Sequence, residues 1–224
     1  MAMLSNLDLI RRVPLFARLT PAQAESLAGA VTKRRYKRGE RIVEQSQTSN
    51  ALFIILTGRA RVLMTDRKGR EVILATLRTG DHVGEMSLID NEPHSASVQA
   101  EILSDVLVLG RDDFAHCLAN NFAMAQAVML VLVQRLRSAD QKIGSLALMS
   151  VYARVADVML ESSVADESGA LWIHDKVSRQ DVAKMVGASR EMVSRVMKDF
   201  EEQGFLETTE SGAVRVHERR LSPR

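Results

Sequence analysis

The stretch SRQDVAKMVGASREMVSRVMKDF, residues 178–200, has the spacing of two short helices joined at a glycine. Ser178 and Ser189 are suited to cap the two helices at their N-termini, with Asp181 as a capping-box-like partner of Ser178. Gly187 is suited to end the first helix in the left-handed conformation. At about 100° per residue, the apolar residues of the second helix fall on one arc: Met192, Val193, Val196, Met197 and Phe200.

The opposite arc of the second helix carries hydrogen-bonding side chains. This spacing is typical of a DNA-binding helix-turn-helix, whose second helix enters the major groove. Arg190 and Arg195 have planar forks that match guanine O6 and N7, and Glu191 can accept from cytosine N4. A solvated helix face with an Arg/Glu pair is the alternative interpretation, and the surrounding motif favours sequence recognition. We predict a DNA interface made of Arg179, Ser189, Arg190, Glu191, Ser194, Arg195 and Lys198, with Arg179 and Lys198 on phosphates.

The residues after this motif predict a wing. The stretch GFLETTESGAVRVHERR, residues 204–220, has the pattern of two strands around a turn at Ser211 and Gly212. Arg215, Arg219 and Arg220 are candidates for phosphate contacts.

Residues 20 to 112 have a different pattern, with β-branched and aliphatic runs that end at glycines. The pattern predicts short strands in an all-β sandwich or barrel. The stretch DRKGR, residues 66–70, is a predicted hairpin turn.

A long helix is predicted after Asp113, because apolar residues there recur at steps of three and four. A seam sustained over more than three heptads is typical of a dimerising helix, so we expect a homodimer. A single amphipathic helix lying on its own domain is the alternative. The predicted seam consists of Phe122, Ala125, Met129, Leu132, Leu136, Ala139, Ile143 and Leu146. The predicted fold is therefore α+β, with N-terminal helices and a β-roll (1–112), a central dimerisation helix (113–149) and a winged helix-turn-helix (150–224).

Composition excludes several function classes. The chain has 224 residues, 46% hydrophobic and 26% charged, as ordinary folded proteins do, and its net charge of +2 argues neither for nor against nucleic acid. The lone Cys117 excludes an intrachain disulfide framework. The histidines are spread singly and no catalytic motif appears, so neither a metal-dependent cupin nor another enzyme is expected. No apolar run reaches the about 20 residues of a membrane span, and a signal peptide is not expected, so a cytoplasmic location is predicted.

Two stretches resemble the CRP/FNR superfamily of bacterial transcription regulators, in its cyclic AMP receptor protein-like members. These are VSRQDVAKMVGASREMVSRVMK (177–198) and GDHVGEMSLIDNEPHSASV (80–98), the latter similar to a phosphate-binding cassette. The resemblance implies a β-roll, a central helix and a winged helix-turn-helix in a dimer that binds palindromic DNA with TGTGA-like half-sites. RNA polymerase is the implied protein partner. Ser194 also occurs in FNR-like members, which prefer a different outer base, so the TGA core is the firmer expectation.

The cassette-like stretch predicts an effector site. Gly84 permits close backbone approach, Glu85 can bind a ribose hydroxyl and Ser95 a phosphate oxygen. His94 stands where the resemblance implies an arginine, and Ala139 and Asp140 stand where it implies a Thr-Ser pair. Asp140 can accept from guanine N1 and N2, which makes cyclic di-GMP a candidate effector and disfavours cyclic AMP. The predicted ligand-binding residues are Gly84, Glu85, Met86, Ser87, His94, Ser95 and Asp140.

Two other interpretations remain open. The β-roll can belong to a ligand-independent regulator of the same kind, or to a binding module that acts on a protein partner. If a ligand does bind beside Ala139 and Asp140, we expect it to act through a hinge near Met149 and Ser150.

Overall fold

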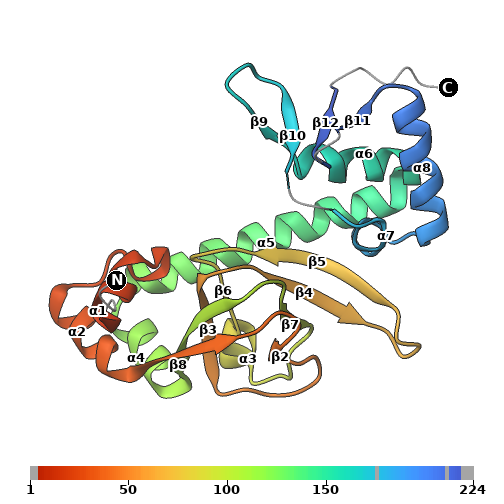
Figure 1. The fold of residues 1–224 in the computed structure, drawn as a ribbon. Helices are drawn as coiled ribbons and strands as arrows, with labels where there is room; N and C mark the ends of the chain where they lie inside the picture. Colours follow the sequence, from red (N-terminus) through yellow and green to blue (C-terminus); the bar gives the residue numbers. More distant parts are fainter. Residues whose placement is uncertain (1–4, 175–176, 210–211, 218–224) are drawn as a thin grey trace. The chain divides into compact units, whose positions relative to one another are not determined.

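The computed structural model describes residues 5–174, 177–209 and 212–217, and the chain forms two compact units, residues 1–137 and 138–224. The elements follow the predicted order, with a β-rich N-terminal unit, a long helix, and a C-terminal unit of helices and a small sheet (Figure 1). The predicted α+β fold class is thus confirmed. The predicted division into three domains, with boundaries at residues 112 and 149, was based on expected roles and stays a prediction.

Two four-stranded antiparallel sheets make up the β-rich part of the first unit. The first sheet has the order β1 (Val31–Tyr36), β8 (Ser104–Gly110), β3 (Ala51–Thr57) and β6 (His82–Val83). The second has the order β2 (Arg41–Val43), β7 (Ser97–Ala100), β4 (Ala60–Thr65) and β5 (Glu71–Leu77). The predicted turn at residues 66–70 joins β4 to β5, and the Asp66 N–H donates to the Arg70 carbonyl over 2.9 Å.

Strands β3 and β8 contribute to two cores because successive strand residues point to opposite faces. Leu52 and Ile54 of β3 lie in a core shared with the N-terminal helices, together with Leu107 and Leu109 of β8. The alternate residues of the same strands, such as Phe53 and Ile55, lie in a second core shared with the other sheet. Strands β3 and β8 are therefore buried on both faces, which explains their nearly continuous apolar runs, whereas β1 at the edge of the sheet is mostly exposed.

Helices cover the outer face of the first sheet, since their residues share its core. These are α1 (Asn6–Arg12), the short 3-10 helix η1 (Pro14–Phe16), α2 (Pro21–Ala30), α4 (Arg111–Asn120) and the start of α5 (Phe122–Leu148). One long helix was predicted from Asp113 onward, but the structure has two, α4 and α5, because the helical backbone is interrupted at Asn121. The Asn121 side chain accepts a hydrogen bond from the Met124 N–H over 2.9 Å, and so caps α5.

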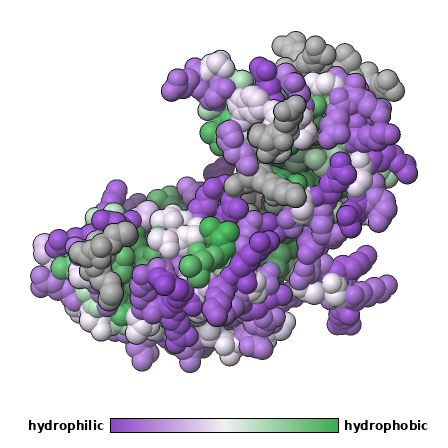
Figure 2. Space-filling model, in the orientation of Figure 1, coloured by the Kyte–Doolittle hydropathy of each residue, from purple (hydrophilic) through white to green (hydrophobic). Residues whose placement is uncertain are grey.

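Helix α5 has one covered and one uncovered apolar face. Met124 and Val128 are buried in the helical core, and Leu132 packs against it partly buried. Other apolar residues of the predicted seam are exposed in the single chain, namely Phe122, Met129, Leu136, Ile143 and Leu146. Elsewhere the face drawn in Figure 2 is mostly polar, with small apolar patches. Exposed apolar side chains in a row along one helix indicate a surface that requires a partner.

Among the described residues, no single helix is long and apolar enough to cross a membrane. Helices α4 and α5 reach that length and apolar character only as a pair, and they meet at a bend of 109°.

The second unit packs three helices against a small antiparallel sheet. Its elements are α6 (Val151–Glu161), β9 (Val164–Ala165), β10 (Leu171–Ile173), α7 (Arg179–Val186), α8 (Arg190–Glu202), β11 (Leu206–Thr208) and β12 (Val214–Val216). The sheet order is β11-β12-β10-β9. The end of α5 belongs to this unit, where Arg154 of α6 donates a hydrogen bond to the Leu146 carbonyl over 3.3 Å. Ser150 caps α6, so the predicted hinge region is the junction of two helices.

Candidate functional site

The predicted helix-turn-helix forms with the predicted caps. The Ser178 hydroxyl accepts from the Asp181 N–H over 3.0 Å, and the Ser189 hydroxyl accepts from the Met192 N–H over 3.2 Å. Gly187 ends α7 in the left-handed region, with φ 65° and ψ 42°. These local signals fix where each helix begins and ends, and therefore which residues open α8.

The buried face of α8 is narrower than predicted. Val193, Val196 and Phe200 are at most 1% exposed, whereas Met192 is 37% exposed, so its prediction as a buried residue was wrong. Met192 lies about 100° from Val193 around the helix, outside the arc that faces the core. Met185 of α7 is likewise half-buried rather than fully buried.

The other face of α8 presents charged groups to solvent. Arg190, Glu191 and Arg195 are exposed, and Ser194 is half-buried beside them. Within the described parts of the chain, neither guanidinium forms an ion pair with a carboxylate. A hydrogen bond from its own backbone N–H, and one from the Ser189 hydroxyl, lower the pKa of Glu191. The arrangement offers two free guanidinium forks and one ionised acceptor at the start of a helix.

The predicted phosphate contacts are also accessible. Arg179 is exposed at the start of α7. Lys198 is exposed and pairs with Glu202 over 3.5 Å; such an exposed pair is worth little and can exchange for a phosphate.

The predicted wing strands form as β11 and β12, joined in one sheet with β10. Arg215 lies with its guanidinium 5.7 Å from the ring centre of Trp172 in β10. The predicted turn residue Ser211, and the predicted contacts Arg219 and Arg220, lie outside the described residues.

The cassette-like stretch forms a six-residue helix, α3 (Glu85–Asp90), seated against β3. Gly84 precedes it with φ 99°, and a Cβ there would come within 2.6 Å of the Ala51 carbonyl oxygen. Only glycine meets both demands. The close approach seen here is to β3 of the same chain, and the predicted approach to a ligand stays a prediction.

Arg135 of α5 joins two buried residues, Glu85 and His82, that sequence reasoning had not connected. The Glu85 carboxylate accepts a hydrogen bond from Arg135, which also donates to the His82 carbonyl. Glu85 is 1% exposed, and burial raises its pKa while Arg135 opposes the rise. Burial, with Arg135 nearby, lowers the pKa of His82 to about 4, so His82 is neutral. Glu85 Oε2 and His82 Nε2 are buried and have no hydrogen-bond partner among the residues that the structure describes.

His94 is held between two serines. Its Nε2 lies 2.8 Å from the Ser49 hydroxyl and its Nδ1 lies 3.0 Å from the Ser87 hydroxyl. Burial lowers the pKa of His94, so it is a neutral group where the resemblance implied a cation. Ser95 beside it is exposed and accessible to a ligand.

The remaining predicted ligand residues are dispersed. Met86 is 47% exposed on the outer side of α3. Asp140 is exposed on the part of α5 that belongs to the second unit. Arg135 was missed by sequence reasoning, because Gln134 before it and Arg137 after it make it look like part of an ordinary polar helix surface.

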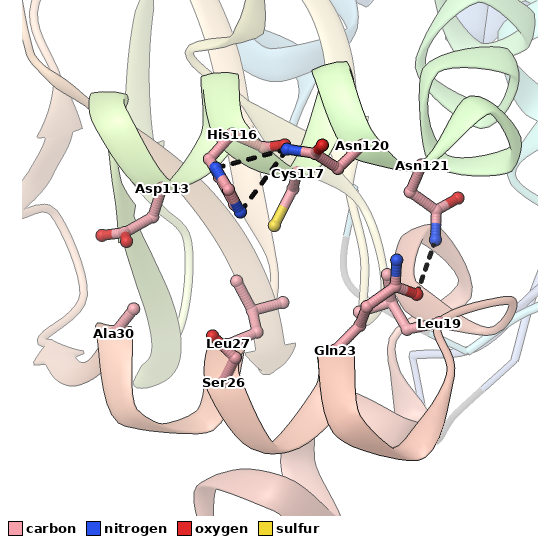
Figure 3. Close-up of a pocket in the computed structure, with 10 residues that line it drawn as sticks. All are labelled: Leu19, Gln23, Ser26, Leu27, Ala30, Asp113, His116, Cys117, Asn120 and Asn121. Atoms are coloured by element: carbon pink, nitrogen blue, oxygen red, sulfur yellow. Dashed lines mark hydrogen bonds between the residues drawn. The ribbon is translucent and has the colours of Figure 1, made fainter.

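A separate cavity lies between α2 and α4 (Figure 3). Asn121 donates a hydrogen bond to Gln23 across one end of it over 3.1 Å. Burial, and then the Asp113 carboxylate, raise the pKa of Cys117 in its wall, so the thiol is not activated. None of the predicted site residues lines this cavity. In the described ranges, no group of three or more His, Cys, Asp or Glu side chains is placed to hold a metal ion.

Comparison with known proteins matches both units. Residues 33–121 match the cyclic nucleotide-binding domain, and residues 153–221 match the Crp-like helix-turn-helix domain. The chain is 32% identical to the cAMP-activated global transcriptional regulator Vfr of Pseudomonas aeruginosa, over 78% of this chain and 84% of Vfr. It is 31% identical to the cyclic AMP receptor protein of Thermus thermophilus, over 93% of this chain and 94% of that protein.

Among solved structures, the c-di-GMP responsive global regulator CLP of Xanthomonas campestris shares the fold. The TM-score is 0.76 at 20% identity, over 89% of this chain and all of the CLP chain.

Proposed function

We propose how this chain, which belongs to the CRP/FNR family of transcription regulators and is not an enzyme, finds its DNA. Two copies pair along α5, and each inserts the start of α8 into one of two successive major grooves about 34 Å apart. Arg190, Glu191 and Arg195 read a TGTGA-like half-site, while Arg179 and Lys198 contact phosphates. RNA polymerase is the proposed protein partner.

The observation that carries this proposal is that two arginines of α8 are exposed and form no ion pair with a described residue. Arg190 and Arg195 are exposed beside the Ser189 cap, and no carboxylate pairs with either in the described residues. An arginine that pairs with a neighbouring carboxylate on the same helix stabilises that helix but has to leave the pair before it can contact a base. Unpaired forks beside an ionised Glu191 are suited to guanine and cytosine edges.

The test is binding to a duplex with two inverted TGTGA half-sites centred one helical turn apart, measured by fluorescence anisotropy. Each bidentate pairing is worth about 1–3 kcal/mol and a dimer makes two, so Arg195→Ala is expected to weaken binding at least about 30-fold. Binding to a scrambled duplex should change far less. Arg67→Ala is the matched control, because Arg67 is an exposed arginine in the β4–β5 turn. Equal losses on both duplexes would contradict base reading.

The proposed dimer is supported by the exposed apolar face of α5. Leu136 is 63% exposed in the single chain, as expected of a residue that a partner covers. Leu136→Glu is expected to give monomers in analytical ultracentrifugation. Gln134→Glu places the same charge on an exposed site of the same helix and should leave the dimer intact. A dimeric Leu136→Glu variant would exclude this seam.

For the effector we propose a cyclic nucleotide or cyclic dinucleotide, with cyclic di-GMP ahead of cyclic AMP. Arg135 beside Glu85, and the unpartnered Glu85 Oε2, support a phosphate and a hydroxyl near α3. The neutral His94 lacks the cation that the resemblance implies beside the phosphate of cyclic AMP, so this position does not favour cyclic AMP. Among the compared proteins, Vfr is cAMP-activated and CLP is c-di-GMP responsive.

Isothermal titration calorimetry with cyclic AMP, cyclic GMP and cyclic di-GMP tests this assignment. Micromolar binding of cyclic AMP would overturn the ranking. No heat from any of the three would favour a ligand-independent regulator, and absence of DNA binding as well would favour a module that acts on a protein partner.

A further inference from the structure

Tyr152 connects the first turn of α6 to the recognition helix α8. Its hydroxyl donates a hydrogen bond to Asp199 Oδ2. Its ring meets Phe200 edge-on, with ring centres 5.9 Å apart and an interplanar angle of 85°. Phe200 is 1% exposed and Tyr152 is 38% exposed, so one edge of the Tyr152 ring rests against the core while its hydroxyl is directed to Asp199. The Asp199 carboxylate is thus held on the side of α8 that faces α6.

Asp199 follows Arg195 by four residues on the same helix. Side chains at this spacing are neighbours, with Cβ atoms about 5–6 Å apart, and opposite charges there attract. Glu191 is the other carboxylate at this spacing, four residues before Arg195. Glu191 is engaged by its own backbone N–H and by the Ser189 hydroxyl. Both carboxylates that flank Arg195 are therefore engaged by other groups. Arg195 itself has no ion pair with any of the described residues.

We propose that Tyr152 is a positioning residue for DNA recognition, which keeps Asp199 away from Arg195 so that the guanidinium stays available for a base. Without the Tyr152 hydroxyl, the Asp199 carboxylate pairs with the Arg195 guanidinium. This ion pair must then break before Arg195 can bind a base. The proposal rests on the role of Arg195 in reading DNA. It adds a residue that lies outside the helix-turn-helix.

The ring and the hydroxyl have separable roles. Tyr152→Phe keeps the ring against Phe200 and removes only the donor to Asp199. Asp199→Asn removes the competing charge while keeping the shape of the side chain. If the hydroxyl serves only to brace α6 against α8, both changes weaken the same contact and should act alike. If it restrains a competitor, the two changes should have opposite consequences for Arg195.

The experiment measures DNA affinity of the full-length dimer by fluorescence anisotropy, on a duplex that the wild-type protein enriches from a random pool. An i,i+4 pair shifts an equilibrium about twofold, and a dimer has two recognition helices, so Tyr152→Phe should weaken binding about fourfold. Asp199→Asn should bind as tightly as wild type or more tightly, and the double variant should recover wild-type affinity. Tyr36→Phe, the same change in β1, is the control.

Salt dependence gives a second readout, because a competing surface pair is screened as ionic strength rises. The ratio of wild-type to Tyr152→Phe affinity should shrink between low and high salt, whereas a purely structural defect would persist. Unchanged affinity of Tyr152→Phe, or a double variant as weak as Tyr152→Phe, would overturn the proposal. A pool in which no sequence is enriched would instead refute DNA reading by α8 itself.

Discussion

Gly84→Ala should destabilise the first unit far more than an ordinary glycine substitution. At φ 99° the new residue is in the left-handed region, which costs about 1–2 kcal/mol for an L-residue. Its Cβ would also meet the Ala51 carbonyl oxygen at 2.6 Å, so α3 or β3 must shift. Overpacking of this kind costs about 1–3 kcal/mol. The sum is about 2–5 kcal/mol, or about 5–15 °C in melting temperature for a unit of this size.

Gly69→Ala separates the two costs. Gly69 has φ 75° in the β4–β5 turn, and a Cβ there would meet nothing within 4 Å. Only the backbone cost applies, so calorimetry should show a loss of about 1–2 kcal/mol, or about 2–6 °C. If the two variants melt within 2 °C of each other, roughly the error of the comparison, then α3 is not seated on β3 as described.

Three further outcomes are expected. Burial lowers the pKa of His82 from 6.5 to about 4, so between these pH values the unfolded chain binds a proton at this residue and the folded chain does not. The free energy of unfolding of the first unit should therefore fall by up to about 3 kcal/mol as pH drops from 6.5 towards 4. His82→Phe should flatten that dependence in urea titrations, and an unchanged slope would mean that another group causes it. Phe200→Ala should cost the second unit about 3–5 kcal/mol, followed by the fluorescence of the single Trp172; a loss below about 1 kcal/mol would contradict its buried position. Ser189→Ala should cost about 1 kcal/mol by the same signal, and no loss would mean that the cap is not formed.

The second unit was largely predictable because its signals are local. Ser178, Gly187 and Ser189 each act on a backbone group within four residues, so their chemistry can be recognised in the sequence. The error at Met192 came from treating the apolar arc as wider than the surface that the core offers. The break at Asn121 was missed for a related reason, since the apolar spacing continues through it while the side chain caps a new helix.

The effector region was predictable only in part, because its contacts join distant segments. Arg135 meets Glu85 across 50 residues of sequence, and His94 meets Ser49 across 45. No spacing rule connects such pairs. Gly84 was singled out from the cassette-like stretch, but its close approach to Ala51 also joins distant segments and was not foreseen. Knowing that the pKa of His94 is lowered further required knowing that the fold buries the imidazole.

Successive side chains of β3 and β8 lie in two different cores, and this limits which insertions and deletions the first unit can accept in evolution. An insertion or deletion of one residue within either strand would turn every side chain beyond it to the opposite face, exchanging the contents of both cores at once. Changes of length are tolerable only where no such phase is kept, as in the β4–β5 turn. Homologous chains should accordingly differ in hairpin length while preserving the residue count of these two strands.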